Sequence, residues 1–203
     1  MKDKIFFDNY IKEFLNQNSM LNLVSKNDEK LLWEKHIFDS LSIENFFSKY
    51  IKDLNGKKLL DIGTGGGFPS IPIALAYPKL EVYALDSIRK KINAIEQIKQ
   101  KLNISNLYPI CSRAEEISDK YDFITCRAVA QLKIIAKYAG RLLKNDGYFI
   151  AYKSIQAIEE IKEAQQVLKK YNFNIDDIIE YDLPLKENHV RNLIIMTIKK
   201  EKC

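Results

Sequence analysis

The stretch LLDIGTGGGFPSIP, Leu59 to Pro72, decides the fold of this chain. It places Asp61 after two apolar residues, followed by four glycines within the five positions from Gly63 to Gly67. Four of the chain's seven glycines lie here, so the backbone must approach another group closely at this point. A short apolar strand that leads through a glycine turn into a helix is typical of nucleotide-binding α/β sheets.

Strands and helices alternate on the carboxyl side of this turn. Short apolar runs predict strands over 59–62, 81–85, 107–111, 123–126 and 148–152. Helical spacing of apolar residues predicts helices over 70–76, 89–102, 131–143 and 155–170, with the third stopped by the sequence Asn145-Asp146-Gly147. This alternation predicts a parallel sheet with helices on both faces. Two last strands, over 175–181 and 193–198, have no crossover helix between them, which suggests one antiparallel strand.

The chain of 203 residues is predicted to be a single domain, residues 1–203. Residues 1–55 form a predicted helical extension, in which Asn27-Asp28 is a plausible helix start, and residues 56–203 form the Rossmann-like core. An apolar share of 46% and a charged share of 29% are ordinary for a soluble globular protein.

Two observations predict a cytoplasmic protein that does not enter a membrane. No run approaches the roughly 18 apolar residues of a membrane span, and the charges in MKDKIFFDNYIKEF exclude a signal peptide. The three cysteines, Cys111, Cys126 and Cys203, are scattered without a CxxC motif, which indicates reduced thiols and no metal site. The net charge of +5 is compatible with a polyanionic partner but does not prove one.

The glycine turn is compatible with two cofactors by spacing alone. A dinucleotide fold requires GxGxxG, whereas Gly63, Gly65 and Gly67 give GxGxG, and counting from Gly65 gives GxGxxS. Asp61 favours a cationic ligand, because a carboxylate near the first glycine would repel a pyrophosphate. S-adenosylmethionine carries an ammonium and a sulfonium and no phosphate. Asp86, at the end of the second strand, is placed to accept from ribose hydroxyls.

The same residues have structural alternatives. The glycines could form a purely structural turn, with Asp61 as a helix-capping residue, but the position of Asp86 makes this less favoured. Ala114-Glu115 follows the third strand, where adenine is commonly contacted, although RAEEI by itself is merely a charged helix start.

Taken together, the motifs resemble a known family. DIGTGGGFPSIPIAL, LDSIRKKINAI, SRAEEI, YDFITCRAVAQL and YFIAYKS, in this order and spacing, are similar to the bacterial small-subunit rRNA guanine-N7 methyltransferases, formerly named glucose-inhibited division protein B. The resemblance covers about residues 20 to 200. Two departures are Lys35, where the family more often shows arginine, and Ser70, where it usually has glycine.

The resemblance implies a class I methyltransferase fold and methylation of N7 of one guanine in a decoding-region loop of 16S rRNA. It implies S-adenosylmethionine as cofactor and 16S rRNA or the small ribosomal subunit as partner. The chain is separately expected to be a monomer, although the sequence does not establish its oligomeric state. The cofactor contacts that the resemblance implies, together with those expected from the motif, are Asp61, Gly63, Gly65, Gly67, Phe68, Asp86, Ser87, Ala114, Glu115 and Arg127. Arg127, Lys153 and Arg191 match positions expected to face RNA.

Methylation at N7 agrees with the absence of catalytic motifs that other base methyltransferases need. Guanine N7 has a free lone pair and no proton, so its attack on a sulfonium methyl needs alignment rather than a general base. The fourth strand ends in CRAVA, without the Asn/Asp-Pro-Pro-aromatic cluster of exocyclic-amine methyltransferases. Cys126 lacks the preceding proline of cytosine-C5 enzymes, which favours a buried small residue over a nucleophile.

Three residues remain candidates for a catalytic role, and each has a structural alternative. Arg127 grips a phosphate or guanine O6, or is a surface arginine at a loop start. Lys153 contacts RNA or is a solvated strand end, and His36 is catalytic or a packing histidine. Phe68 stacks on the extruded guanine or packs against the cofactor.

RNA recognition is expected from a basic rim that includes Lys57, Lys58, Arg89, Lys90, Lys91, Arg113, Lys133 and Lys137. Two rival functions stay open: a small-molecule methyltransferase on the same fold, and a non-enzymatic nucleotide-binding or ribosome-assembly protein. Methyl transfer to RNA or to metabolites, or cofactor binding without turnover, separates them.

Overall fold

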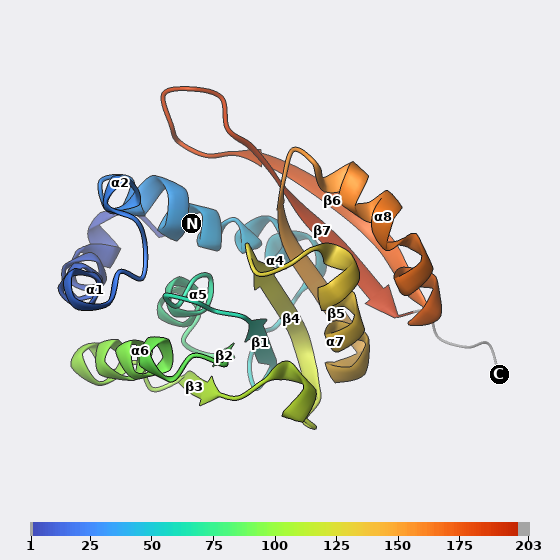
Figure 1. The fold of residues 1–203 in the computed structure, drawn as a ribbon, viewed down its shortest axis with the longest axis horizontal. Coiled ribbons are helices and arrows are strands. Elements are labelled where there is room, and N and C mark those ends of the chain that lie inside the picture. The colour runs from blue at the N-terminus through green and yellow to red at the C-terminus, as the bar shows by residue number, and fades with distance from the viewer. Residues whose placement is uncertain (1, 199–203) are drawn as a thin grey trace.

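All strands in the computed structural model, which describes residues 2–198, lie in one sheet (Figure 1). The strands are β1 (Lys58–Ile62), β2 (Glu81–Asp86), β3 (Leu107–Cys111), β4 (Tyr121–Arg127), β5 (Leu143–Ser154), β6 (Phe173–Asp182) and β7 (Val190–Ile198). Their order is β3-β2-β1-β4-β5-β7-β6, and β7 runs antiparallel to both neighbours. This confirms the predicted mostly parallel sheet of seven strands with one antiparallel strand. Cys203 lies outside the described residues.

Helices cover both faces of the sheet. α5 (Ser70–Ala76) and α6 (Arg89–Leu102) pack on one face, and α7 (Leu132–Leu142) and α8 (Ala157–Lys170) pack on the other (Figure 1). Successive residues of a strand point to opposite faces, and neighbouring leucines of β1 accordingly enter different hydrophobic clusters. Because β1 to β5 run parallel, their carboxyl ends lie at one common edge of the sheet, where the loops that carry the predicted site meet.

The junction between α7 and β5 differs from the prediction. The helix ends at Leu142, one residue before its predicted end, but β5 begins directly at Leu143 and runs through the Asn145-Asp146-Gly147 sequence. Leu143 pairs with Tyr121 at the start of β4, so pairing between strands extends β5 through the polar residues that were expected to form a turn.

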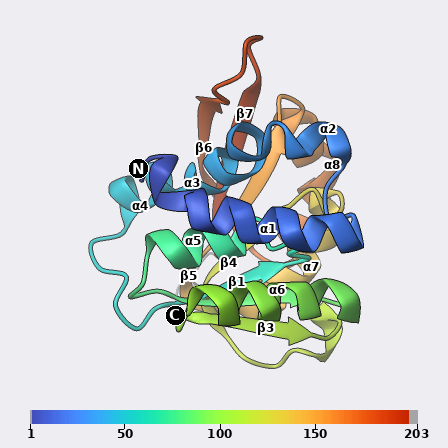
Figure 2. The same cartoon turned by 90° about the vertical axis from the view of Figure 1, so that its left-hand side faces the viewer.

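The amino-terminal extension is helical but interrupted. Its elements are the 3₁₀ turn η1 (Ile5–Phe7), α1 (Asp8–Leu21), α2 (Lys26–Glu29), the π-helical turn η2 (Trp33–Phe38), α3 (Asp39–Leu41) and α4 (Ile43–Tyr50). α1 lies alongside α6 (Figure 2). The helix start predicted at Asn27-Asp28 is displaced, because Ser25 caps α2 by accepting a hydrogen bond from the backbone N–H of Asp28 at 3.1 Å.

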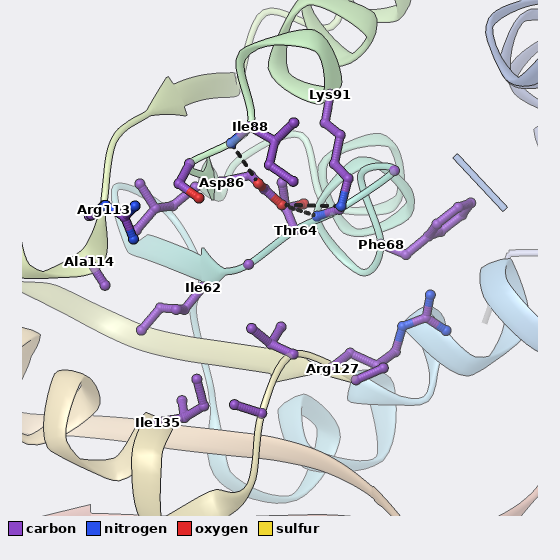
Figure 3. Close-up of a pocket in the computed structure, with 18 of the residues that line it drawn as sticks. Ile62, Thr64, Phe68, Asp86, Ile88, Lys91, Arg113, Ala114, Arg127 and Ile135 are labelled. Carbon is purple, nitrogen blue, oxygen red and sulfur yellow. Dashed lines mark hydrogen bonds and ion pairs between the residues drawn. The ribbon is translucent and has the colours of Figure 1, made fainter. Parts of the chain in front are cut away.

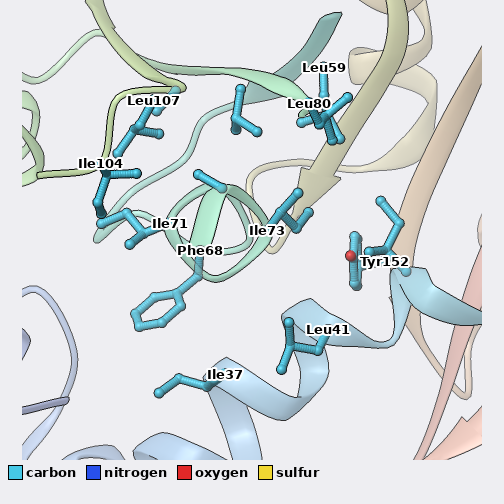
Figure 4. Close-up of a cluster of buried hydrophobic side chains, with 14 of the residues drawn as sticks. Ile37, Leu41, Leu59, Phe68, Ile71, Ile73, Leu80, Ile104, Leu107 and Tyr152 are labelled. Atoms are coloured by element: carbon cyan, nitrogen blue, oxygen red, sulfur yellow. The ribbon is translucent and has the colours of Figure 1, made fainter. Parts of the chain in front are cut away.

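The extension and the sheet share one hydrophobic core. Phe14 of α1 packs its ring 5.0 Å from that of Phe68, just beyond the glycine turn, and Ile37 and Leu41 lie close by (Figure 4). The hydroxyl of Tyr152, on β5, donates to the carbonyl of Ser40 at 2.8 Å. On this ground we propose that the extension and the Rossmann-like core form a single domain.

Candidate functional site

The glycine turn between β1 and α5 has a conformation that side chains would disturb. Gly63 and Gly67 adopt φ values of 72° and 92°, in the left-handed region that favours glycine. A Cβ at Gly63 would lie 2.5 Å from the methyl groups of Val129, and one at Gly67 would lie 2.4 Å from Cδ1 of Ile71. The glycines are therefore required by the backbone conformation and by close approach of neighbouring side chains.

Asp86, at the end of β2, holds this turn in place by hydrogen bonds (Figure 3). Its Oδ2 accepts from the N–H of Gly65 at 3.0 Å, and its Oδ1 accepts from the N–H of Ile88 at 2.9 Å. The Lys91 ammonium lies 4.0 Å from Oδ2. One carboxylate thus ties the loop after β1 to the loop after β2, with lone pairs left over for a ligand.

A cavity of about 500 Å³, named the cofactor cavity, opens at this edge of the sheet. It is lined by the loops that follow β1, β2, β3 and β4 and by the first turns of α7. The predicted cofactor residues that line it are Gly63, Gly65, Phe68, Asp86, Ser87, Ala114, Glu115 and Arg127. Asp61 and Gly67 do not line it.

The hydrogen bonds made by the backbone N–H groups of the glycine turn argue against a pyrophosphate ligand. The N–H groups of Gly63 and Thr64 donate to the carbonyl of Leu85, and those of Gly67 and Phe68 donate to the carbonyl of Thr64. Phosphate-binding turns instead keep such N–H groups free for the anion. Apolar side chains of the cavity wall, including Ile88 and Ile134, suit an adenine ring, and Asp86 suits ribose hydroxyls. The residues present therefore fit S-adenosylmethionine better than a dinucleotide.

The end of this cavity that Ala114 and Glu115 line is fixed by contacts from α7. The hydroxyl of Tyr138 donates to the Glu115 carboxylate at 2.6 Å, and Arg141 donates to the carbonyl of Glu115 at 2.8 Å. These contacts fix the short turn η3 (Ala114–Glu116) that follows β3. Sequence reasoning missed them, because α7 is distant from this turn along the chain.

Asp61 is completely buried below the glycine turn. Its Oδ1 accepts from the Thr125 hydroxyl at 3.1 Å, whereas its Oδ2 has no hydrogen-bond partner among the described residues. Burial raises the pKa of Asp61 to about 6, although nearby hydroxyl groups and the charge of Arg127 oppose this rise. Its influence on a ligand is therefore electrostatic and acts through the turn, rather than by direct contact.

We expect cofactor affinity to depend on the ionisation of Asp61. A cationic ligand favours the charged carboxylate, so affinity is full well above the Asp61 pKa of about 6 and falls as the pH drops through it. Calorimetry between about pH 5 and 8 should show S-adenosylmethionine binding weakened by about fivefold at the acid end. The Asp61→Asn variant should bind weakly at every pH and lose this dependence. An unchanged pH profile in that variant would assign the effect to another group.

Arg127 points into a polar cluster built by the amino-terminal extension. Its Nη1 donates to Asp39 Oδ2 at 2.8 Å and to the carbonyl of Lys35 at 3.1 Å, and its Nη2 lies 3.0 Å from His36 Nδ1. The guanidinium carbon stands 5.3 Å from the centre of the Phe68 ring. With its side chain only 13% exposed, Arg127 is not the surface arginine of the structural alternative.

This cluster determines the state of His36. Arginine can only donate, so Nδ1 of His36 must accept and the ring proton sits on Nε2. Burial and the Arg127 charge lower the pKa of His36 to about 4, so the ring is neutral at physiological pH. His36 lies in the π-helical turn η2 instead of a regular helix, and its Nε2 is buried without a partner among residues 2–198.

Phe68 belongs to an aromatic cluster rather than to an open surface. It is 4% exposed, and its ring contacts those of Tyr10, Phe14 and His36. A stacking platform for an RNA base needs an accessible face. The geometry therefore favours packing at the cofactor cavity over stacking on guanine.

A second cavity, of about 620 Å³, adjoins the first and is named the acceptor cavity. The wall that both cavities share consists of His36, Arg127, Ala128, Val129 and Ala130. All three predicted RNA-facing residues, Arg127, Lys153 and Arg191, line the acceptor cavity.

For Lys153, the structure excludes one of the two interpretations offered by the sequence, and the RNA contact stays a prediction. The Lys153 side chain is only 8% exposed, so it is not a solvated strand end. Its ammonium lies 2.6 Å from Glu160 Oε2 and donates to the carbonyl of Ala130 at 3.2 Å. Lys153 is thus a largely buried group in the wall of the acceptor cavity.

The structure also locates two lysines of the expected basic rim and one cysteine. Lys57 and Lys58 lie at the start of β1, at the opposite end of the strand from the cavities, and Lys57 pairs with Asp122 at 3.3 Å. They therefore do not belong to a rim around the site. Burial raises the pKa of Cys126 to about 12, and Cys126 lines neither cavity, which agrees with a buried small residue.

Residues 2–198 contain no cluster of three or more His, Cys, Asp or Glu side chains arranged to hold a metal ion. None of the helices in the described part of the chain has the length and hydrophobicity that a membrane span requires.

The sheet order and the cofactor cavity define a class I S-adenosylmethionine-dependent methyltransferase. The same fold occurs in the YcgJ protein of Bacillus subtilis, with a TM-score of 0.63, 15% identity, and coverage of 80% of this chain and 99% of that one. It also occurs in M. jannaschii TYW2 in complex with AdoMet, with a TM-score of 0.58, 17% identity, and coverage of 79% and 77%.

The sequence identifies the particular family. The family model of rRNA small subunit methyltransferase G (GidB) matches residues 4–194, and the chain belongs to this family. It is 37% identical over 196 residues to ribosomal RNA small subunit methyltransferase G of a Thermoanaerobacter species, covering 94% of this chain and 80% of that one. The enzyme of the same name from Listeria monocytogenes serotype 4b is 30% identical over 201 residues, covering 96% and 82%. The resemblance seen in the motifs is thereby confirmed.

Proposed function

We propose that this enzyme transfers a methyl group from S-adenosylmethionine to N7 of one guanine in the decoding-region loop of 16S rRNA. The observation that carries the proposal is the wall shared by the two cavities, across which donor and acceptor must meet. It contains a neutral histidine, an arginine paired with Asp39, and three apolar residues. Among the described residues, no carboxylate or thiol belongs to this wall, which suits a reaction that removes no proton.

The chemistry places simple demands on such a wall. Bound S-adenosylmethionine supplies a methyl group on a positively charged sulfur, and guanine N7 attacks with a lone pair that carries no proton. The protein must align N7 with the methyl carbon and accommodate a purine that becomes cationic. His36, held neutral by burial and by the Arg127 charge, which together lower its pKa, adds no positive charge against that cation.

The acceptor cavity has room for an extruded base and offers cationic groups for its phosphates. A nucleotide that is modified on its base must leave its stack and enter a pocket. Arg191 lines the cavity, and its guanidinium makes no hydrogen bond or ion pair with any residue among 2–198. This supports a role for Arg191 in binding RNA phosphate. Arg127 is committed to Asp39 and His36, so we assign it a positioning role in the wall.

We further infer that the enzyme works in the cytoplasm, and that it works as a monomer, because residues of one chain line both cavities. Light scattering under turnover conditions measures the molar mass of the active enzyme, which should be that of one chain. A single domain, residues 1–203, is part of the same proposal.

The test uses labelled S-adenosylmethionine and small ribosomal subunits from cells that lack this protein, followed by chemical cleavage at 7-methylguanine. Cleavage at one guanine of the decoding-region loop is the expected result. Transfer only to small metabolites would favour the small-molecule rival. Cofactor binding without transfer to subunits or to naked rRNA would favour the non-enzymatic one.

A further inference from the structure

Three carboxylates line the acceptor cavity, and two of them are fully engaged by the protein. Asp28 accepts from Lys35 at 3.0 Å through Oδ1 and from the Ser25 hydroxyl at 2.7 Å through Oδ2. Asp39 accepts from the Tyr181 hydroxyl at 2.6 Å through Oδ1 and from Arg127 through Oδ2. Neither has an oxygen atom left without a donor.

Glu160, in the first turn of α8, differs from both. Its Oε2 accepts from the backbone N–H of Leu132 at 3.0 Å and lies 2.6 Å from the Lys153 ammonium. Its Oε1 has no hydrogen-bond partner among the described residues. The Oε2 contacts hold the carboxylate in place, and the side chain is one-quarter exposed and lines the acceptor cavity, so Oε1 is the oxygen available to a ligand there.

Lys153 completes a pair of opposite hydrogen-bonding groups. An ammonium has three N–H donors, and two of them are used by Glu160 and by the carbonyl of Ala130. One donor therefore remains beside one free carboxylate oxygen. Both residues line the acceptor cavity but not the cofactor cavity.

We propose that Glu160 selects guanine by accepting from its N1–H and 2-amino groups through Oε1, while Lys153 donates to O6. This rests on the proposed function. An ionised carboxylate oxygen has two lone pairs and can accept both donors. Adenine presents the reverse pattern, an acceptor at N1 and an amino donor at C6. It would therefore place an acceptor against the Glu160 carboxylate and a donor against the Lys153 ammonium.

The placement also orients the reacting atom. N1 and the 2-amino group lie on the six-membered ring, and N7 lies on the five-membered ring across the base. With its Watson–Crick edge on Glu160 and Lys153, which line only the acceptor cavity, the guanine keeps N7 on its opposite side, free of these contacts and open to the methyl group. The carboxylate charge in addition stabilises a purine that becomes positive during transfer.

The experiment compares guanosine with inosine, which keeps N1–H and O6 but lacks the 2-amino group. Small subunits are reconstituted with 16S rRNA that carries either nucleoside at the methylated position, and transfer from labelled S-adenosylmethionine is measured. The wild-type enzyme should lose about tenfold to a hundredfold in kcat/KM with inosine, because a hydrogen bond to a charged group is lost.

Glu160→Gln provides the second arm. The amide oxygen can keep the Leu132 and Lys153 contacts, which directs the amide NH₂ group at the donors of guanine. Its kcat/KM should fall on guanosine and become nearly equal for the two substrates. The matched control is Glu159→Gln, an exposed neighbour that lines neither cavity and should keep the wild-type ratio.

The outcomes separate this inference from the proposed function. If the wild-type enzyme fails to methylate N7 of the guanosine substrate, the proposed function is wrong. If it methylates guanosine and inosine equally well, or if Glu160→Gln keeps the wild-type ratio, the role of Glu160 is wrong and the function stands. A purely structural Glu160 would lower the melting temperature of the variant without altering that ratio.

Discussion

Replacing Arg127 by alanine is expected to lower the free energy of unfolding by about 3–5 kcal/mol, because it leaves the buried Asp39 carboxylate without its cation. The two interpretations drawn from the sequence, a contact to RNA and a surface arginine, do not predict such a loss of stability. The structure changes this expectation, since Arg127 joins β4 to η2 and α3 through three hydrogen bonds. Urea unfolding of the variant, followed by circular dichroism, measures the loss.

A double variant separates stability from catalysis. Arg127→Met combined with Asp39→Asn removes both charges and keeps an acceptor for the Tyr181 hydroxyl, so most of the stability should return. Methyl transfer should remain low, because His36 loses the donor that fixes its ring proton on Nε2. Full transfer by the stable double variant would reduce Arg127 to a structural residue. A stable Arg127→Ala single variant would contradict the energetic argument.

The parts of the fold that were predicted best depend on local sequence. The bounds of α5, α6 and β3 agree with the prediction, because strong apolar periodicity or a glycine turn marks their ends. The predicted start of β5 was wrong because pairing of Leu143 with Tyr121 is a tertiary interaction. The π-helical turn around His36 likewise has no local signal that distinguishes it from a regular helix.

The residues of the candidate site likewise fall into those that could be predicted from local sequence and those that could not. Asp86, Ala114 and Glu115 could be assigned to one cavity because parallel strands bring their carboxyl ends to a common edge. Glu160 and Tyr181 could not, because their positions depend on how α8 and β6 pack beside β5 and β7. In the sequence, Glu160 is only one of several acidic residues in a helix, and the partners that make it distinctive are remote.

Replacing Asp86 by alanine is expected to weaken S-adenosylmethionine binding by about a hundredfold or more, through the loss of charge-assisted hydrogen bonds. The variant loses the acceptor for ribose hydroxyls and also the two bonds that hold Gly65 and Ile88 in place. Asp86→Asn keeps one oxygen acceptor and should lie between the wild type and the alanine variant. Calorimetric titration with S-adenosylmethionine measures all three affinities.

Asp122→Ala is the matched control for this prediction. Asp122 also joins two segments by accepting a backbone N–H, that of Lys58 at 3.0 Å, and it pairs with Lys57 and Lys144. It lies at the opposite end of β1 from the cofactor cavity, so its loss should lower the melting temperature and leave cofactor affinity unchanged. If both variants lost affinity equally, the effect at Asp86 would reflect general loosening of the sheet. Loss in the Asp86 variant alone would locate ribose recognition at the end of β2, because of these two carboxylates only that of Asp86 faces the cavity.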